Sequence, residues 1–382
     1  MTDQNGQPLH DQPTAATQDS RARAIRRKRN VFRNHRVPTT PMGKVPAAWA
    51  IESYGSDGVP AELVPFADWF DAEDDARERF RWALRDSLDE LLDGQRTGRW
   101  AYQHLSKTEK TYLGTAVEVN LTKEFEFPNG SHLDWQIAGR DIDCKFSKDL
   151  GGWEIPMEMY LCDDHGGRQG KANQPALVTW LNDDTSQWAA GLMTITDERL
   201  RWRSDTKTGQ LVRAYNRDNK RRVNISARKD IHWLWGGLQT DLPRNLLLHL
   251  NVDARARVFS FPRSGQARVN QLFREVQGRI VGRQTVLTVA QQDDAPKRAR
   301  DARLSLRPEG ILVLGHQGSH PHIARALELL MPAKGEWISV RVVPVTEADS
   351  RPFFTLNGQR WAAARDAEPG SAAPRLPKKA IP

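Results

Sequence analysis

The sequence predicts an α/β protein with two folded domains, and three observations lead to this prediction. The 382 residues are enough for two domains of ordinary size. Over 68–94 apolar residues recur with helical spacing, whereas over 131–146 apolar and polar residues alternate as they do in paired strands. Further along, helical patterns between 267 and 303, the last of them basic, precede a strand over 311–314. The order helix, turn, helix, basic helix and hairpin is typical of a winged helix-turn-helix.

Local composition predicts where the tails, the two domains and the linker between them begin and end. Residues 1–44 are polar and then strongly basic, which predicts a disordered tail that either lies along phosphates or is simply solvated. A first folded domain is expected over 45–210. The polar residues 211–222 have the composition of a linker, and residues 223–365 are expected to form the second domain. The Ala-, Pro- and Lys-containing residues 366–382 are expected to be a second disordered tail.

Charge and hydropathy narrow the function classes. The formal net charge of +8 and the pI of about 9.6 favour an anionic partner, of which nucleic acid is the commonest. No apolar run approaches the roughly 20 residues that cross a bilayer, and the N-terminus does not resemble a signal peptide, so we expect a cytoplasmic protein with no membrane partner. The two cysteines, Cys144 and Cys162, exclude a disulfide framework and a metal-binding cysteine pair.

The strongest catalytic motif is Asp134 followed by Asp143-Cys-Lys145. Residues two apart in a strand project from the same face, so Asp143 and Lys145 share one face while Cys144 points into the packing. Gly139 lies between the two expected strands, and a turn there folds Asp134 back beside Asp143. Two carboxylates and an ammonium then lie within reach of one divalent metal. Magnesium prefers such oxygen ligands and supports phosphodiester hydrolysis.

Two further acidic residues bear on this site. Glu118 lies among small and apolar residues on a helix expected over 107–119, which suggests that it faces inward as a third carboxylate. The alternative is an ordinary exposed helix glutamate. Asp141 shares the face of Asp143 by strand alternation, but it lies nearer the turn and competes for the same role. An Asp-x-Lys tripeptide alone is usually a surface pair, so the prediction depends on the whole set.

The order of a helix glutamate, a strand aspartate, a hairpin and Asp143-Cys-Lys145 resembles the PD-(D/E)xK nuclease pattern. More narrowly, the chain resembles the NaeI group of type II restriction endonucleases from about Glu78 to Arg360. The segments that carry this resemblance are Leu88–Trp100, Leu133–Trp135 and Asp141–Lys145. It implies that 45–210 is an endonuclease domain with a restriction-endonuclease-like core, a mixed sheet flanked by helices.

The resemblance also implies roles and partners. Glu118, Asp134 and Asp143 would ligate Mg²⁺, and Lys145 would be catalytic. The family's second domain binds another copy of the recognition site and activates cleavage, and the implied protein is a homodimer on double-stranded DNA. We therefore expect a type II site-specific deoxyribonuclease that cuts both strands. The alternatives are a repair nuclease or nickase of the same fold and, in another class, a non-catalytic DNA-binding regulator.

Basic residues outside this motif are candidate DNA contacts. Arg96 and Arg99 lie in a segment that looks like the Lys-x-Asp-Gly-x-Arg motif of DNA ligases. Leu91 stands where the nucleophilic lysine would be, which excludes ligase chemistry. Both arginines either contact phosphate or belong to an ordinary helix end and turn. In the second domain the expected contacts lie on the basic helix, at Lys297, Arg298, Arg300 and Arg303.

Three histidines lie within 316–322, with His-x3-His-x-His spacing that is compatible with a metal. No acidic residue or cysteine lies beside them in the sequence. We therefore predict that they belong to a loop or a helix cap.

Overall fold

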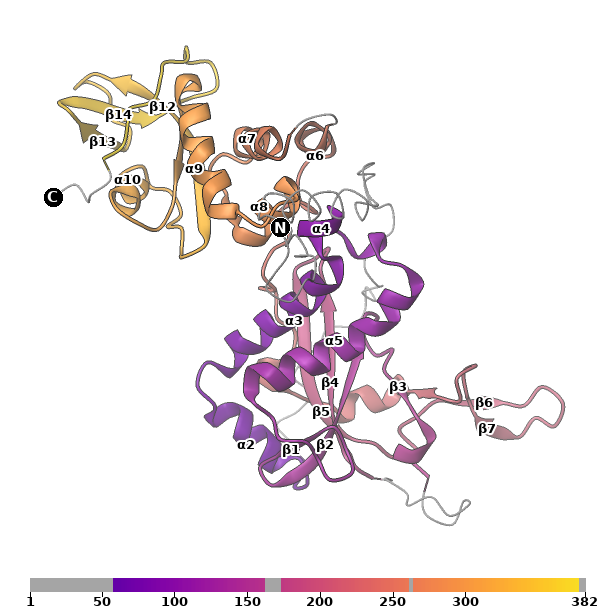
Figure 1. Ribbon diagram of the computed structural model, residues 1–382. Helices are drawn as coiled ribbons and strands as arrows, with labels where there is room; N and C mark the ends of the chain where they lie inside the picture. The colour runs from indigo at the N-terminus through magenta and orange to yellow at the C-terminus, as the bar shows by residue number, and fades with distance from the viewer. Residues whose placement is uncertain (1–57, 162–172, 261–263, 378–382) are drawn as a thin grey trace, which may run out of the picture. The chain divides into compact units, whose positions relative to one another are not determined.

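The computed structural model of the protein describes residues 58–161, 173–260 and 264–377 (Figure 1). The chain forms two compact units, and each contains segments that are distant in the sequence. Within the described residues the first unit comprises 58–92 and 100–249. The second comprises Asp93–Arg99 and 250–377. The basic tail over 1–44 and Cys162 lie outside the described residues.

A mixed sheet is the centre of the first unit. Its strands, in spatial order, are β1 (Trp135–Ile137), β2 (Arg140–Ser147), β4 (Pro175–Asn182), β5 (Gln187–Thr194) and β9 (His232–Trp233). Strands β2 and β4 run parallel, and the other neighbours run antiparallel. The alternation expected over 131–146 is therefore confirmed as the β1–β2 pair, although its first strand is short.

Helices of the first unit pack on one face of this sheet. They are α2 (Val64–Ala72), α3 (Ala76–Leu92) and α5 (Lys107–Phe125). We expected a single helix over 68–94, but the structure has α2 and α3 instead. The break lies beside Asp75, whose φ of 53° cannot continue a right-handed helix. Helix α5 begins at a capping box between Ser106 and Glu109 and runs six residues beyond the expected end at 119.

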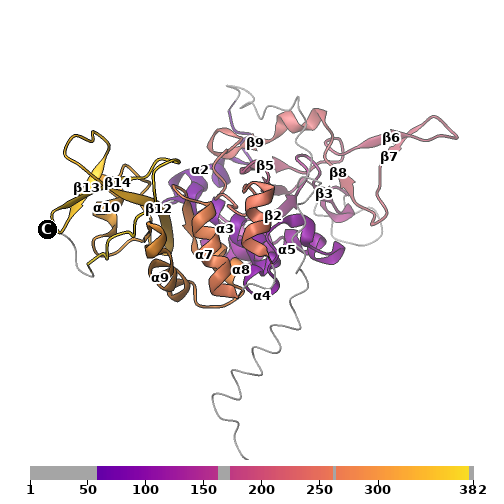
Figure 2. The same ribbon diagram turned by 90° about the horizontal axis from the view of Figure 1, so that it is seen from above.

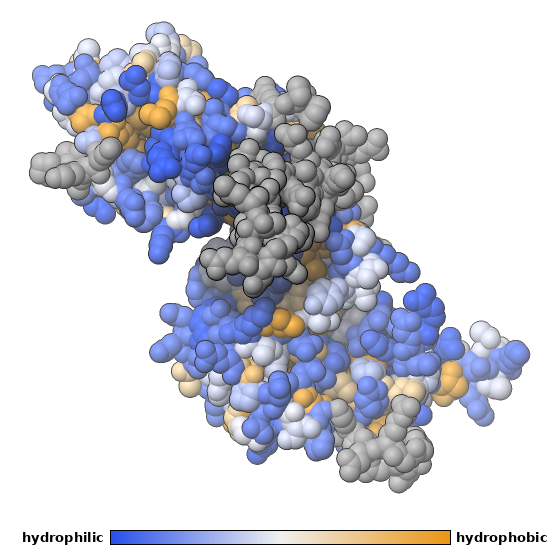
Figure 3. Space-filling view, in the orientation of Figure 1, coloured by the Kyte–Doolittle hydropathy of each residue, from blue (hydrophilic) through white to orange (hydrophobic). Residues whose placement is uncertain are grey.

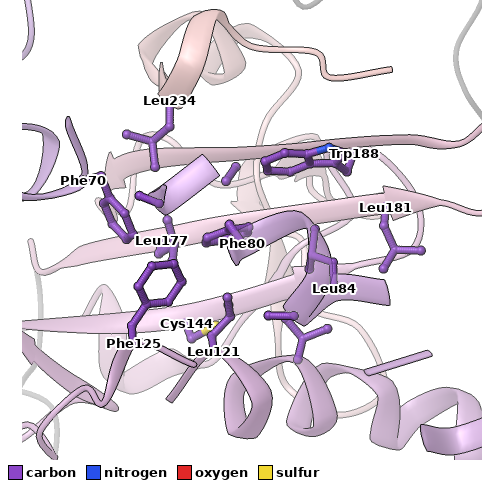
Figure 4. Close-up of a cluster of buried hydrophobic side chains, with 14 of the residues drawn as sticks. Phe70, Phe80, Leu84, Leu121, Phe125, Cys144, Leu177, Leu181, Trp188 and Leu234 are labelled. Atoms are coloured by element: carbon purple, nitrogen blue, oxygen red, sulfur yellow. The ribbon is translucent and has the colours of Figure 1, made fainter. Parts of the chain in front are cut away.

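The two faces of the sheet bury separate hydrophobic clusters. Figure 4 shows the cluster under the helices, where Phe80, Leu121 and Cys144 meet Leu177 and Trp188. The cluster on the opposite face is rich in tryptophan and combines residues of the sheet with residues of the segments outside it. Its members include Trp153, Ile155, Ala176, Val178, Trp180, Leu200 and Val223. Because Ala176 and Val178 alternate with Leu177 along β4, the central strand is buried on both faces.

Two small ribbons lie outside the main sheet of the first unit. In one, β3 (Glu154–Ile155) pairs with β8 (Arg221–Arg222), and in the other β6 (Trp202–Ser204) pairs with β7 (Leu211–Arg213). The sequence predicted a linker over 211–222, but the structure has β7 and β8 there instead. The first unit continues to His249, so the unit boundary lies near residue 250. A polar ribbon and a polar linker have the same composition, which explains the difference.

The second unit combines helices with an antiparallel sheet. Its helices are α4 (Gly94–Thr97), α6 (Val252–Phe259), α7 (Gly265–Glu275), α8 (Arg283–Ala290), α9 (Ala295–Leu306) and α10 (His320–Ala326). Its strands are β10 (Ile280–Gly282), β11 (Ile311–Leu314), β12 (Glu336–Val345), β13 (Phe353–Leu356) and β14 (Gln359–Ala363). Strand β12 pairs with β10, β11 and β14, and β14 pairs with β13. The expected helices between 267 and 303 and the strand over 311–314 are confirmed.

Short 3-10 helices complete the described secondary structure. They are η1 (Tyr102–His104), η2 (Met157–Met159), η3 (Ser226–Asp230), η4 (Leu234–Gly236) and η5 (Arg307–Glu309). Within the described residues no helix is long and apolar enough to cross a membrane.

The segment Asp93–Arg99 belongs to the second unit although it lies between two parts of the first. Its helix α4 packs against α8. A Cβ at Gly94 would lie 2.2 Å from Oγ1 of Thr288, so only glycine allows this approach. The Asp-Gly turn noted in the sequence is therefore a packing element of the second unit.

The C-terminal residues that we expected to be disordered are packed as far as 377. Ala373 is buried, and its N–H donates to the carbonyl oxygen of Arg307 at 2.9 Å. Glu368 forms an ion pair with Arg351 at 2.7 Å. The small, Pro-containing composition of this segment predicted a tail, but its backbone finds partners on the second unit. Residues 378–382 lie outside the described residues.

Candidate active site

A tight hairpin brings the first two carboxylates together. Strands β1 and β2 pair with Trp135 opposite Ile142, and the same register places Asp134 opposite Asp143. The turn consists of Ala138 and Gly139, which have φ values of 51° and 73°. Two successive residues with positive φ are typical of the two-residue turns that match the twist of a hairpin.

Asp134 and Asp141 accept hydrogen bonds from different parts of the backbone, and this gives them different roles. The carboxylate of Asp134 accepts the N–H of Cys144 at 2.7 Å, which holds it beside the Asp143 backbone. The carboxylate of Asp141 accepts the N–H groups of Ser131 and His132 at 3.1 and 2.6 Å. Although burial opposes its charge, these N–H groups keep the pKa of Asp141 below its usual range. Asp141 therefore shapes the loop before Asp134 and is occupied by the backbone.

Strand alternation separates Cys144 from its neighbours, as predicted. Cys144 points into the cluster under the helices (Figure 4), where burial raises the pKa of its thiol. Asp143 and Lys145 lie opposite Ala176 and Val178 of β4, which belong to the cluster on the other face. The Lys145 ammonium donates to the Asp143 carboxylate. Burial alone would lower the pKa of Lys145, but the charge of Asp143 outweighs it and raises the pKa.

Glu118 joins this group from helix α5. Its side chain is half-buried, and burial is the largest cause of the raised pKa of its carboxyl group. The negative charges of Asp134 and Asp143 also raise this pKa, while Lys145 opposes them. Such mutual influence places the four side chains in one electrostatic neighbourhood. The alternative of an isolated, exposed helix glutamate does not account for it.

The donor set matches what a hard divalent cation requires. Three carboxylates carry more negative charge than one ammonium neutralises, so a cation would relieve the repulsion that raises the pKa of Glu118. The side chains are nevertheless arranged around Lys145 and the Cys144 N–H rather than around a common centre. Among the described residues no group of three or more His, Cys, Asp or Glu side chains is preassembled for a metal.

Two residues that the sequence did not single out support strand β2. The hydroxyl of Thr179 on β4 donates to the carbonyl oxygen of Lys145 at 3.2 Å. The indole N–H of Trp180 donates to the carbonyl oxygen of Lys148 at 3.1 Å. Neither contact follows from a local pattern, because parallel pairing joins segments about 30 residues apart.

The candidate DNA contacts divide into exposed and packed residues. Lys297 and Arg300 are exposed on α9, whereas Arg303 donates to the carbonyl oxygen of Val313 at 2.8 Å. Arg298 is half-buried and donates to the side-chain oxygen of Gln266 at 3.2 Å. The buried residues Ala295, Ala299, Ala302 and Leu306 define the packed face of this helix. In α4, Arg96 is exposed and paired with Asp93, while Arg99 is buried.

The three histidines of 316–322 contribute to a turn and a helix start, as predicted. Helix α10 begins at His320, whose Nδ1 accepts the N–H of Gly315 at 3.0 Å. Burial, aided by the nearby charge of Arg303, lowers the pKa of His320 to about 4. A neutral imidazole is what this acceptor role requires.

Comparison with known proteins agrees with the geometry. The sequence family described as "Restriction endonuclease NaeI" matches residues 65–371, which include both units. The chain is 43% identical to the "Type II restriction enzyme NaeI" of Lentzea aerocolonigenes over 312 residues, which cover 79% of this chain and 90% of that protein. The match spans the hairpin with Asp134, Asp143 and Lys145. The chain therefore belongs to the NaeI family of type II restriction endonucleases.

Proposed function

We propose that the protein hydrolyses both strands of duplex DNA at a specific short site, with Mg²⁺ as its cofactor. The observation that carries this proposal is the shared neighbourhood of Glu118, Asp134, Asp143 and Lys145. Glu118, Asp134 and Asp143 supply the oxygen ligands. When bound, the metal polarises the phosphate and lowers the pKa of the attacking water.

Lys145 has a role that follows from its contact with Asp143. Its ammonium is half-buried, remains charged and donates to the Asp143 carboxylate. A fixed positive charge in such a place stabilises the negative charge that develops on the phosphate oxygens during hydrolysis. Water is the nucleophile, because the described residues of the site offer carboxylates, which bind the metal, and a protonated amine, which cannot attack.

The second unit supports a role in DNA binding. Its elements α7, β10, α8, α9, β11 and β12 follow one another with β10 and β11 both paired to β12. From this order we infer a winged helix-turn-helix, whose third helix would enter the major groove. In that arrangement α9 would be the helix in the groove, and its exposed residues include Lys297 and Arg300. We infer that this unit holds a second copy of the recognition site and activates cleavage, and that the protein acts as a homodimer.

Digestion of a sequenced plasmid with Mg²⁺, followed by mapping of the ends, tests the proposed reaction. Linear product with fixed ends is the expected result. Nicked circles would instead favour the repair nickase, and no metal-dependent cleavage of any site would contradict the proposal. Activation is tested on a plasmid with one site, which should be cut slowly and should be cut faster when a short duplex carrying that site is added.

A further inference from the structure

A two-stranded ribbon, β6–β7, projects from the first unit. Figures 1 and 2 both show it extending beyond the sheet and helices of that unit. Trp202 pairs with Arg213 and Ser204 pairs with Leu211. In the space-filling view the ribbon is covered largely by hydrophilic residues (Figure 3). Its outer part, from Arg203 to Leu211, is exposed apart from half-buried Asp205, so packing of the core does not account for it.

The base of the ribbon is fixed by a buried arginine. Arg221 is fully buried, and its guanidinium lies 4.9 Å from the ring centroid of Tyr160 and 4.8 Å from that of Trp202. It donates to the carboxylate of Asp197, which also accepts from Arg213 at 2.5 Å. Because one carboxylate joins an arginine of β7 to the buried arginine of β8, the ribbon is tied to the rest of the unit at its base. A buried cation with such partners is costly to displace.

The ribbon begins on the side of the sheet that carries the catalytic residues. Asp143 and Lys145 project from the face of the sheet that is covered by the tryptophan-rich cluster. Ile155, Leu200 and Val223 belong to that same cluster. These residues lie on β3, just before β6 and just after β8, so they anchor the ribbon to this face. The ribbon is therefore anchored on the face of the sheet from which Asp143 and Lys145 project.

The basic residues of the ribbon region, defined as residues 201–222, fall into two groups: those that form ion pairs and those that do not. The region contains eight Arg and Lys residues against two Asp residues, an excess that a protein surface without an anionic partner does not require. Four of the cations are occupied by carboxylates. They are Arg213 and Arg221 with Asp197, Arg222 with Glu154, and Arg217 with Asp218. Arg203, Lys207 and Lys220 are exposed and form no ion pair within the described residues.

We propose that the β6–β7 ribbon lies in a groove of the substrate duplex and that Arg203, Lys207 and Lys220 contact its phosphates. This inference rests on the proposed function. The major groove of DNA is about 12 Å wide and admits a two-stranded ribbon. Phosphate contacts of this kind position a duplex without reading its sequence. The ribbon thus extends the grip of the first unit on DNA beyond the scissile phosphate.

A triple variant, Arg203→Gln, Lys207→Gln and Lys220→Gln, tests the proposal. Its affinity for a 30-base-pair duplex of random sequence is measured by fluorescence anisotropy over a series of salt concentrations, with Ca²⁺ in place of Mg²⁺. Each lost phosphate contact lowers the slope of log Kd against log salt by about 0.9, so the full variant should lose about 2 to 3. The cleavage rate at saturating DNA should stay within about twofold of wild type.

Matched variants exclude a general effect of charge. Lys207→Gln should lower the slope by about 0.9, whereas Lys123→Gln, an equal loss of charge at an exposed position of α5, should leave it unchanged. Equal effects of the two variants, or an unchanged slope in the triple variant, would overturn the inference. Leu211 is 66% exposed, and Leu211→Ser tests the other occupant, a second copy of the chain. A change in oligomeric state with unaltered DNA affinity would assign the ribbon to a protein interface and reject the DNA contact.

The experiments distinguish failure of the ribbon inference from failure of the proposed function. If wild type neither binds nor cleaves any duplex, the proposed function fails. If wild type binds and cleaves while the triple variant keeps its full salt slope, only the ribbon inference fails. The substituted side chains are exposed and take no part in the contacts of Arg221 with Tyr160, Trp202 and Asp197, so a thermal melt should match wild type.

Discussion

The carboxylate of Asp134 accepts the backbone N–H of Cys144 at 2.7 Å. This contact crosses the hairpin between two strands and involves the residue between Asp143 and Lys145. The backbone next to Asp143 therefore fixes the position of the Asp134 carboxylate. A change in the hairpin moves the whole group together, so the site should respond to substitutions that never touch the metal or the substrate.

Asp143→Ala should abolish cleavage while DNA binding persists. The substitution removes a proposed metal ligand, and it also releases Lys145 from its carboxylate partner. Plasmid cleavage and duplex binding are measured side by side, the latter with Ca²⁺, which fits oxygen ligands but tolerates looser geometry than Mg²⁺. Cleavage near the wild-type rate would reject the assignment of the site.

Lys145→Met should also abolish turnover while the carboxylates remain able to bind a metal. Methionine keeps much of the length and bulk of the side chain but removes the charge that we propose stabilises the phosphate in the transition state. Single-turnover rates on a plasmid substrate are the measurement. A residual rate within about tenfold of wild type corresponds to only about 1.4 kcal/mol of barrier and would place Lys145 outside the catalytic group.

Asp141→Ala should lower both stability and cleavage, although Asp141 is not a proposed ligand. The change removes the acceptor of the Ser131 and His132 N–H groups, and because water can replace it at this exposed position, the cost is about 0.5 to 1.5 kcal/mol of unfolding free energy. The loop then no longer fixes Asp134. Chemical denaturation and cleavage rates are compared with those of Gln136→Ala, the residue opposite Asp141 in the hairpin. If both variants behave alike, the N–H contacts are not what positions the loop.

The second unit should lose stability as the pH falls from about 6.5 towards 4. His320 has a pKa of about 4 in the folded protein, below the 6.5 of an unperturbed histidine, so protonation favours the unfolded chain. Because the unfolded chain binds more protons than the folded protein between these two pKa values, stability falls as the pH falls through this window, by at most about 3.4 kcal/mol. Unfolding is followed against pH in wild type and in His320→Asn. A slope that the substitution leaves unchanged would assign the acid sensitivity elsewhere.

Activation by a second duplex should depend on the exposed face of α9. We expect Lys297→Ala with Arg300→Ala to weaken activation of one-site plasmid cleavage and to reduce its salt dependence, because these two side chains are exposed. Arg303→Ala should instead destabilise the second unit, since its guanidinium donates to Val313. Activation rates and melting temperatures are measured for each. Full activation in the double variant would remove α9 from the effector site.

The local parts of the site were predictable, whereas the distant parts were not. The alternation of Asp143, Cys144 and Lys145 depends only on the period of a strand, and the structure confirms it. The support from Thr179 depends on parallel pairing between distant segments, which no local pattern specifies. Likewise, the sequence grouped Arg303 with Lys297 by charge. The alanines of α9 recur with helical spacing and form its packed face. By the same spacing, Lys297 and Arg300 lie together on another face of the helix.

The two predictions about the fold that were wrong, the linker and the single helix, also have a physical reason. Strands β7 and β8 are short, and the polar residues 216–220 lie between them, so this stretch has the composition of a linker. The break between α2 and α3 includes Asp75, whose positive φ is compatible with aspartate but is not required by it. In both cases a contact with the rest of the unit selects the backbone conformation, and the sequence alone leaves it open.

Helix α4 has a consequence for how the chain acquires its structure. Gly94 leaves the ribosome about 190 residues before Thr288, the side chain against which it packs. The second unit cannot be completed until that later segment has been synthesised, and the closure of so long a loop slows the search for the contact. A fragment that starts at residue 250 would lack α4 and expose the α8 surface beneath it. Synthesis from the N-terminus therefore makes α4 available long before the α8 surface that it covers, and the second unit is completed only after the first.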